Sequence, residues 1–237
     1  MATFQTIINR ARRTLLEVAE VSDSFWTDAE LLEHGINAAK DLWKGVIDVY
    51  QDHFLRINTT SVSVVANQST LSGVPADCFR VKSIEPRVPA SYPNMFFRPR
   101  DWGHTTFIGA RAGAAQDPTG SVFLYDLVGP GPPVAAPDVW IGPQSSSNVL
   151  LTFAYISAVS DSLTTASVNP IPGETDMAVQ AWIVAHARAK EREDRSPDPE
   201  WLAIYGTEKA NLIVAVTPRQ EDEPDITEDL FGEAFDG

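Results

Sequence analysis

Apolar residues recur every three or four positions near both ends of the chain, a spacing that predicts amphipathic helices there. The clearest start is Thr27, whose hydroxyl can accept a hydrogen bond from the amide of Glu30 while the Glu30 side chain reaches back to Thr27. We predict a helix from this cap to about His53. Its buried stripe is expected to contain Leu32, Ile36, Ala39, Trp43, Val46, Ile47 and Tyr50.

Three further helices have the same period. One is predicted from a Thr3 cap to about Val21, one over about 174–194, and one from an Asp198 cap, with Pro199 at its first position, to just before Pro218. Their inward residues are expected to be Phe4, Ile7, Ile8, Ala11, Leu15, Val18 and Ala19, then Met177, Ala178, Ala181, Trp182, Ala185 and Ala189, then Trp201, Ile204, Tyr205, Leu212 and Ala215. Because the long helix needs partners, we expect the two ends of the chain to meet.

Between about Asn58 and Val168 the period changes from 3.6 to 2, which predicts strands. They are expected at 61–66, 70–71, 78–84, 121–127, 139–143 and 148–156, with a turn at 67–69. The segment 86–120 is rich in Pro, Gly, Arg and aromatic residues, and we predict an irregular contact surface there. Five or six strands suffice for a small barrel or sandwich.

The pattern as a whole predicts an α+β protein, in which an antiparallel β-barrel or sandwich is inserted into a helical bundle. We divide the chain into N-terminal helices of the base (1–57), the β-rich insertion (58–168), C-terminal helices that complete the base (169–217) and an acidic tail (218–237).

Charge is concentrated in that tail. The net charge is −14, and residues 218–237, with one basic and eight acidic side chains, carry half of it. Such a segment is expected to be disordered alone. Its four large apolar residues predict instead that it folds against a partner: Ile226, Leu230, Phe231 and Phe235. A protein that wraps nucleic acid needs clustered Lys and Arg, so the overall charge argues against that class.

The N-terminal region has no basic and apolar signal segment, and no apolar run approaches the length that spans a bilayer. Cys78 is the only cysteine, which excludes an intrachain disulfide and a cysteine-based metal cluster. We therefore expect a soluble protein made in the cytoplasm.

Candidate chemistry is sparse. None of the four histidines (His34, His53, His104 and His186) belongs to a metal-binding pair or a nucleophile motif. His104 lies in a predicted loop with Asp101, and a small hydrolase using these two residues is one hypothesis. The glycines do not form a phosphate-binding loop. We predict no enzyme, no catalytic, cofactor-binding or metal-binding residues, and no cofactor.

Two groups of residues are predicted to contact other molecules. Arg10, Arg12 and Arg13 share one face of the first helix, as a solvated face, a protein–protein surface or a nucleic-acid contact. The aromatic residues Phe96, Phe97 and Trp102 of the irregular segment favour a protein interface.

Three motifs stand in a specific order along the chain. The first is the octapeptide 25–32 (FWTDAELL) followed by 36–39 (INAA). The second is Leu71 followed by 74–81 (VPADCFRV). The third joins 176–182 (DMAVQAW), 187–194 (ARAKERED) and 201–205 (WLAIY). Together they resemble the head-to-tail connector or adaptor proteins of tailed bacteriophages, which include the adaptors of short-tailed phages and the related tail tubular protein.

This resemblance implies a structural protein of the virion neck. Members form a ring, commonly of twelve subunits, that docks under the portal protein, extends the channel through which genomic DNA leaves, and receives the tail or nozzle protein. They have no enzymatic site. For this chain we also expect no membrane partner. A stopper or a tail-tube ring of similar build is an alternative function. The tail residues are our candidates for binding the portal or a neighbouring subunit.

Overall fold

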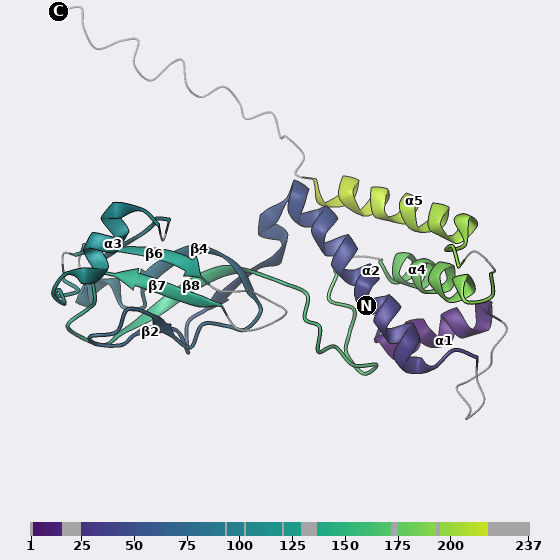
Figure 1. Ribbon diagram of the computed structural model, residues 1–237, viewed down its shortest axis with the longest axis horizontal. Helices are drawn as coiled ribbons and strands as arrows, with labels where there is room; N and C mark the ends of the chain where they lie inside the picture. Colours follow the sequence, from purple (N-terminus) through teal and green to yellow (C-terminus); the bar gives the residue numbers. More distant parts are fainter. Residues whose placement is uncertain are drawn as a thin grey trace, which may run out of the picture.

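A computed structural model describes residues 2–15, 25–92, 94–101, 103–119, 121–128, 137–171, 175–192 and 195–217. The fold is α+β, as predicted, and it has two parts that lie side by side, a helical base and a β-rich part (Figure 1). Each part has its own apolar core.

The helical base joins both ends of the chain. It contains α1 (Phe4–Thr14), α2 (Asp28–Val49), α4 (Asp176–Ala189) and α5 (Pro199–Val216). Helix α4 packs against all three others and is buried on most sides, so the expectation that the two ends meet is confirmed (Figure 1). Its buried residues are Ala178, Val179, Ala181, Ile183, Val184, Ala185 and Ala187.

Local capping signals set the starts of these helices. Thr27 accepts the Glu30 amide at 3.2 Å, and Glu30 accepts the Thr27 amide at 3.0 Å, which is the predicted capping box. Asp198 accepts hydrogen bonds from the amides of Glu200 and Trp201, and Pro199 occupies the first turn. Thr3 caps α1.

The buried stripe of α2 is rotated relative to the prediction. Its buried centre is Leu31, Gly35, Ala38, Ala39, Leu42, Val46 and Ile47, whereas Leu32, Ile36 and Trp43 lie at its border and Tyr50 is exposed. The reason is Gly35. A Cβ atom there would lie 3.0 Å from Cδ1 of Phe4, so the glycine lets the Phe4 ring approach the α2 backbone.

Some predicted helix ends differ. Helix α2 stops at Val49, and a 3-10 turn, η1 (Gln51–Phe54), follows in place of the predicted end near His53. Helix α1 ends at Thr14, and the predicted continuation to Val21 lies outside the described residues. Met177 and Ala215, predicted to point inward, are exposed because α4 and α5 turn those faces to solvent.

The larger sheet of the β-rich part is built around β8 (Val149–Ser157). Strands β1 (Leu55–Asn58) and β2 (Ser63–Val64) pair with successive parts of one edge of β8, and β4 (Cys78–Pro86) pairs with the other edge, all antiparallel. Strand β3 (Leu71–Ser72) pairs with β2 across the predicted turn, where Asn67 has a positive φ of 59°. Leu151, Phe153 and Tyr155 are all buried on one face, as predicted.

The smaller sheet contains β5 (Phe96–Pro99), β6 (Val122–Val128) and β7 (Asp138–Gly142) in that order. The two sheets share one core, but within the described residues both are open, so of the predicted barrel or sandwich the barrel is wrong. An isolated bridge from Thr70 to Trp140, with the Ile141 amide donating to the Ser69 carbonyl at 2.8 Å, links the start of β3 to β7, too little to close a barrel. Strand β5 is also parallel to β6, whereas the prediction was a purely antiparallel arrangement.

The segment 86–120 is more regular than predicted. It contains η2 (Pro89–Ser91), β5 and α3 (Thr105–Ala112), the last covering part of the smaller sheet (Figure 1). Two register shifts in β4, at 78–80 and 81–83, also change which residues face the core. Cys78 is therefore buried and Phe79 is 39% exposed.

The base and the β-rich part are also joined by side-chain contacts at the end of α2. The indole Nε1 of Trp43 donates to the carbonyl oxygen of Ser157 at 2.9 Å. The Trp43 ring also meets Phe79 edge-on, with centroids 5.0 Å apart. These contacts tie β8 and β4 of the larger sheet to the long helix.

Candidate functional site

The arginine face of α1 contains only two exposed arginines. Arg12 is fully buried: its Nη2 donates to the Asp28 carboxylate and to the Trp26 carbonyl, each at 2.8 Å, and its Nε donates to Asp28 at 3.0 Å. This guanidinium joins α1 to the start of α2 and does not reach the surface. Arg10 and Arg13 remain exposed, and Arg10 lies 3.9 Å from Asp176.

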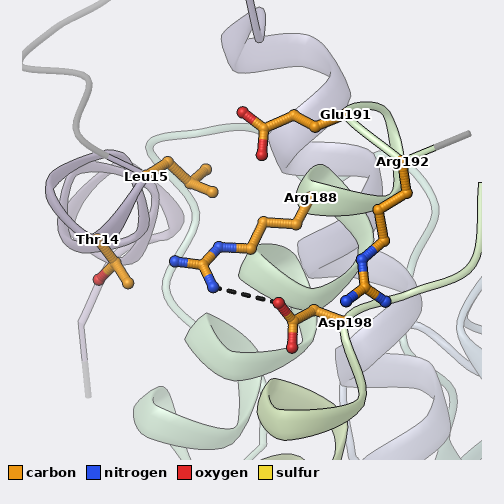
Figure 2. Close-up of a pocket in the computed structure, with 6 residues that line it drawn as sticks. All are labelled: Thr14, Leu15, Arg188, Glu191, Arg192 and Asp198. Carbon is orange, nitrogen blue, oxygen red and sulfur yellow. Dashed lines mark hydrogen bonds and ion pairs between the residues drawn. The ribbon is translucent and has the colours of Figure 1, made fainter.

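A hollow of about 290 Å³ opens beside the C-terminal end of α1 (Figure 2). It is lined by Thr14, Leu15, Arg188, Glu191, Arg192 and Asp198. Arg188 is 3.1 Å from Asp198, and Arg192 donates to the Pro197 carbonyl at 3.4 Å. Burial acts to raise the pKa of Asp198, but hydrogen bonds from Arg188 and from the α5 amides outweigh it and hold the pKa below its usual value. The cations and the cap thus hold α4 and α5 together.

The outer side of β5 and β6 is the most apolar exposed surface among the predicted contact residues. Phe96 is 53% exposed and pairs with Val122, which is 42% exposed; the next pair is Arg98 with Leu124. We call these four residues the β5–β6 face. Phe97 points the other way and stacks on Phe123 at 5.5 Å, so it extends the core.

Helix α3 covers the adjacent strand and leaves the β5–β6 face uncovered. Gly142 of β7, which pairs with Leu124, lies so close to α3 that an added Cβ would be 3.0 Å from Cγ of Arg111. Phe96 could be predicted from the sequence, but Val122 and Arg98 could not, because their juxtaposition with Phe96 depends on a parallel register that no local pattern encodes.

The loop around His104 is part of a helix cap. His104 precedes α3, and its Nδ1 accepts from the Thr106 amide at 3.2 Å, while its Nε2 lies 3.1 Å from Nη2 of Arg100. Asp101 accepts the His104 amide through its backbone carbonyl at 2.9 Å. Both imidazole nitrogens face groups of the chain itself, a geometry typical of a structural histidine.

Two polar clusters connect the helices of the base. Asp41 of α2 accepts from the Tyr205 hydroxyl and, at 2.6 Å, from Lys209 of α5. Burial acts to raise the pKa of Asp41, but the Lys209 and Tyr205 hydrogen bonds hold it below its usual value. Across α2 and α4, the rings of His34 and His186 are 5.5 Å apart. Burial, and then the charge of His186, lowers the pKa of His34.

The described residues contain no group of three or more His, Cys, Asp or Glu side chains placed to hold a metal ion. Among the described helices, none combines the length and the apolar character needed to cross a membrane. Trp102 and the tail residues Ile226, Leu230, Phe231 and Phe235 lie outside the described residues. Comparison with protein-family models and with curated proteins finds no match for this chain.

Proposed function

We propose that this chain is a structural head-to-tail adaptor of a tailed phage, which forms a ring, of about twelve copies, under the portal protein and receives the tail or nozzle protein. The proposal starts from the order of motifs that resembles the adaptor family. The observation that carries it is the pair of dissimilar surfaces on the two parts of the molecule: the charged Arg10 and Arg13 face on the base and the apolar β5–β6 face.

A ring of identical subunits in head-to-tail contact needs two different surfaces on each subunit, because one surface of each copy meets the other surface of the next. The base and the β-rich part supply such surfaces from separate cores. The engaged polar groups around His104 and Asp198 give further support to a structural role, since their bonds stabilise helix ends.

The net charge of −14 per subunit fits a channel for DNA. Repeated around a ring, it gives an acidic lining that repels phosphates, so that genomic DNA passes without adhering. The chain would be made in the host cytoplasm and would reside in the virion neck.

The test is the mass of the purified chain, alone and mixed with the portal protein of the same phage, by light scattering with negative-stain imaging. We expect a monomer near 25.9 kDa that assembles into a ring of about twelve copies on the portal. Phe96→Asp should weaken ring formation, whereas Ile108→Asp, an equally exposed change on α3 outside both surfaces, should not.

A chain that does not bind the portal would contradict the proposal. A Phe96→Asp variant that assembles on the portal as well as the wild type would contradict the assigned surface. A ring that forms without the portal and binds a tail-tube protein would instead favour the stopper or tail-tube function. DNA binding that weakens with salt and is lost on replacing Arg10 and Arg13 would refute the non-adhesive channel.

A further inference from the structure

Exposed apolar side chains gather where the base meets the β-rich part. They are Val49, Tyr50, Leu55, Ile57 and Phe79, which are 37–64% exposed, and we call them the joint patch. Ring contacts run through the joint from Tyr50 to His53, Phe54, Trp43 and Phe79. Leu55 of β1 and Arg80 of β4 both pair with Ile156, from opposite edges of β8. The side chains of Leu55 and Arg80 therefore lie on the same face of the sheet.

We propose that the acidic tail, residues 218–237, binds the joint patch of its own chain. This inference concerns the free protein and does not depend on ring formation. Three observations support it: the place where the tail begins, the length of chain before its first apolar residue, and the chemistry of the two surfaces.

The tail begins beside the patch. Helix α5 runs along α2, with Lys209 bonded to Asp41 and Ile213 close to Gly45, where an added Cβ would lie 3.6 Å from Ile213 Cδ1. Helix α5 ends at Val216, next to the C-terminal end of α2 (Figure 1). The tail therefore follows Thr217 at a point near Val49, the first residue of the patch.

The spacer is long enough. Residues 218–225 precede Ile226, and eight extended residues span at most about 26–29 Å. From Val49 to Ile57 the chain passes through one 3-10 turn and one short strand, roughly 20 Å in all. Ile226 can thus reach any part of the patch. Because the spacer is short, the local concentration of the tail at its own patch is on the order of millimolar, which favours this arrangement over the tail of another copy.

The chemistry of the two surfaces matches. Ile226, Leu230, Phe231 and Phe235 are spaced by four, one and four residues, so they can present a single apolar face, and Glu228, Asp229 and Glu233 lie between them. At the patch, the Arg80 guanidinium lies over the Phe79 ring, 5.9 Å from its centroid. Arg56 lies on β1 at the other edge of β8 and pairs with Asp77 at 3.0 Å. The apolar contacts thus have the Arg80 cation at their border to meet the acidic residues.

Hydrogen exchange of the full-length chain, without portal protein, tests the inference. We expect amides of residues 226–235 to exchange at least about ten-fold more slowly than in an unstructured peptide. Ile57→Asp should abolish this protection, because it replaces the most exposed apolar residue of the patch with a charge of the same sign as the tail. Phe96→Asp is the matched control: it makes the same change at a similarly exposed position in the other sheet and should leave the protection intact.

The reciprocal variant, Phe231→Ser, should speed exchange in β1 with an unchanged circular dichroism spectrum. Tail amides that exchange at unstructured rates in the wild-type chain, or that remain protected in Ile57→Asp, would overturn the inference. Protection that appears only at concentrations where light scattering detects oligomers would also overturn it, because the occupant would then be the tail of another copy. Since none of these measurements uses the portal, their failure leaves the adaptor proposal standing.

Discussion

Replacing Arg12 with methionine should destabilise the chain far more than the same change at its neighbour Arg13. Methionine keeps most of the aliphatic stem but removes the guanidinium, which makes two hydrogen bonds to Asp28 and one to the Trp26 carbonyl. The Arg12 side chain is only 1% exposed, whereas that of Asp28 is 23% exposed. The variant therefore leaves a carboxylate that water can partly solvate and a carbonyl that has lost a donor.

These exposures set the expected magnitude. Removing one partner of a fully buried ion pair costs about 3–5 kcal/mol, and partial hydration of Asp28 should bring its share down to about 2 kcal/mol. Leaving the buried Trp26 carbonyl without this donor adds about 1 kcal/mol, the low end for a lost buried hydrogen bond. We expect a total near 3 kcal/mol, which lowers the melting temperature by roughly 6–12 °C in a domain of this size.

Urea unfolding followed by circular dichroism, with thermal melts in parallel, measures this loss. Arg13→Met is the control, because Arg13 is exposed on the same helix, and its change should stay within about 0.5 kcal/mol. The reasoning is refuted if Arg12→Met loses less than about 1 kcal/mol or no more than the Arg13 variant.

Three further predictions concern packing, pH and thiol reactivity. Gly35→Ala should destabilise the base by about 1–3 kcal/mol in urea unfolding, because the new methyl meets the Phe4 ring, whereas Gly206→Ala, on an open part of a helix, should be neutral or stabilising. Stability should fall as the pH drops through about 6.5, since the lowered pKa of His34 lets the unfolded chain take up the proton first; His34→Gln should flatten this dependence in melts from pH 8 to 5. Burial raises the pKa of Cys78 to about 12, so the native thiol should resist alkylation at pH 8 and react fully in urea.

Features set by neighbouring residues could be predicted from the sequence. The capping box of Thr27 and Glu30 and the Asp198–Pro199 start lie within single turns, and the structure has both. The period of the helices also shows that the ends of the chain must pack together. The exact face of α2 that is buried could not be predicted, because Gly35 lies at its centre and a glycine does not count as apolar in the pattern.

Features that depend on distant residues could not be predicted. Arg12 looks like a surface residue until Asp28, sixteen positions away, is folded against it. Two bulges in β4 exchange the environments of Cys78 and Phe79. Helix α3 is short and contains a glycine, so its period is too weak to stand out in a segment rich in prolines. At the candidate contact surface, the exposure of Phe96 agrees with the expected role, but its pairing with Val122 needed the register of β5.

The central position of β8 has a consequence for biosynthesis. Strands β1, β2 and β4 all form ladders with residues 149–157, so during translation β1 and β4 have no ladder partner, and β2 has only β3, until this late segment leaves the ribosome. The core of the base can form only later still, because α4 begins at Asp176. Neither core can close before about two thirds of the chain has been made, and such long-range closure slows folding. Folding should therefore be essentially post-translational, and nascent chains stalled before residue 149 should depend on chaperones.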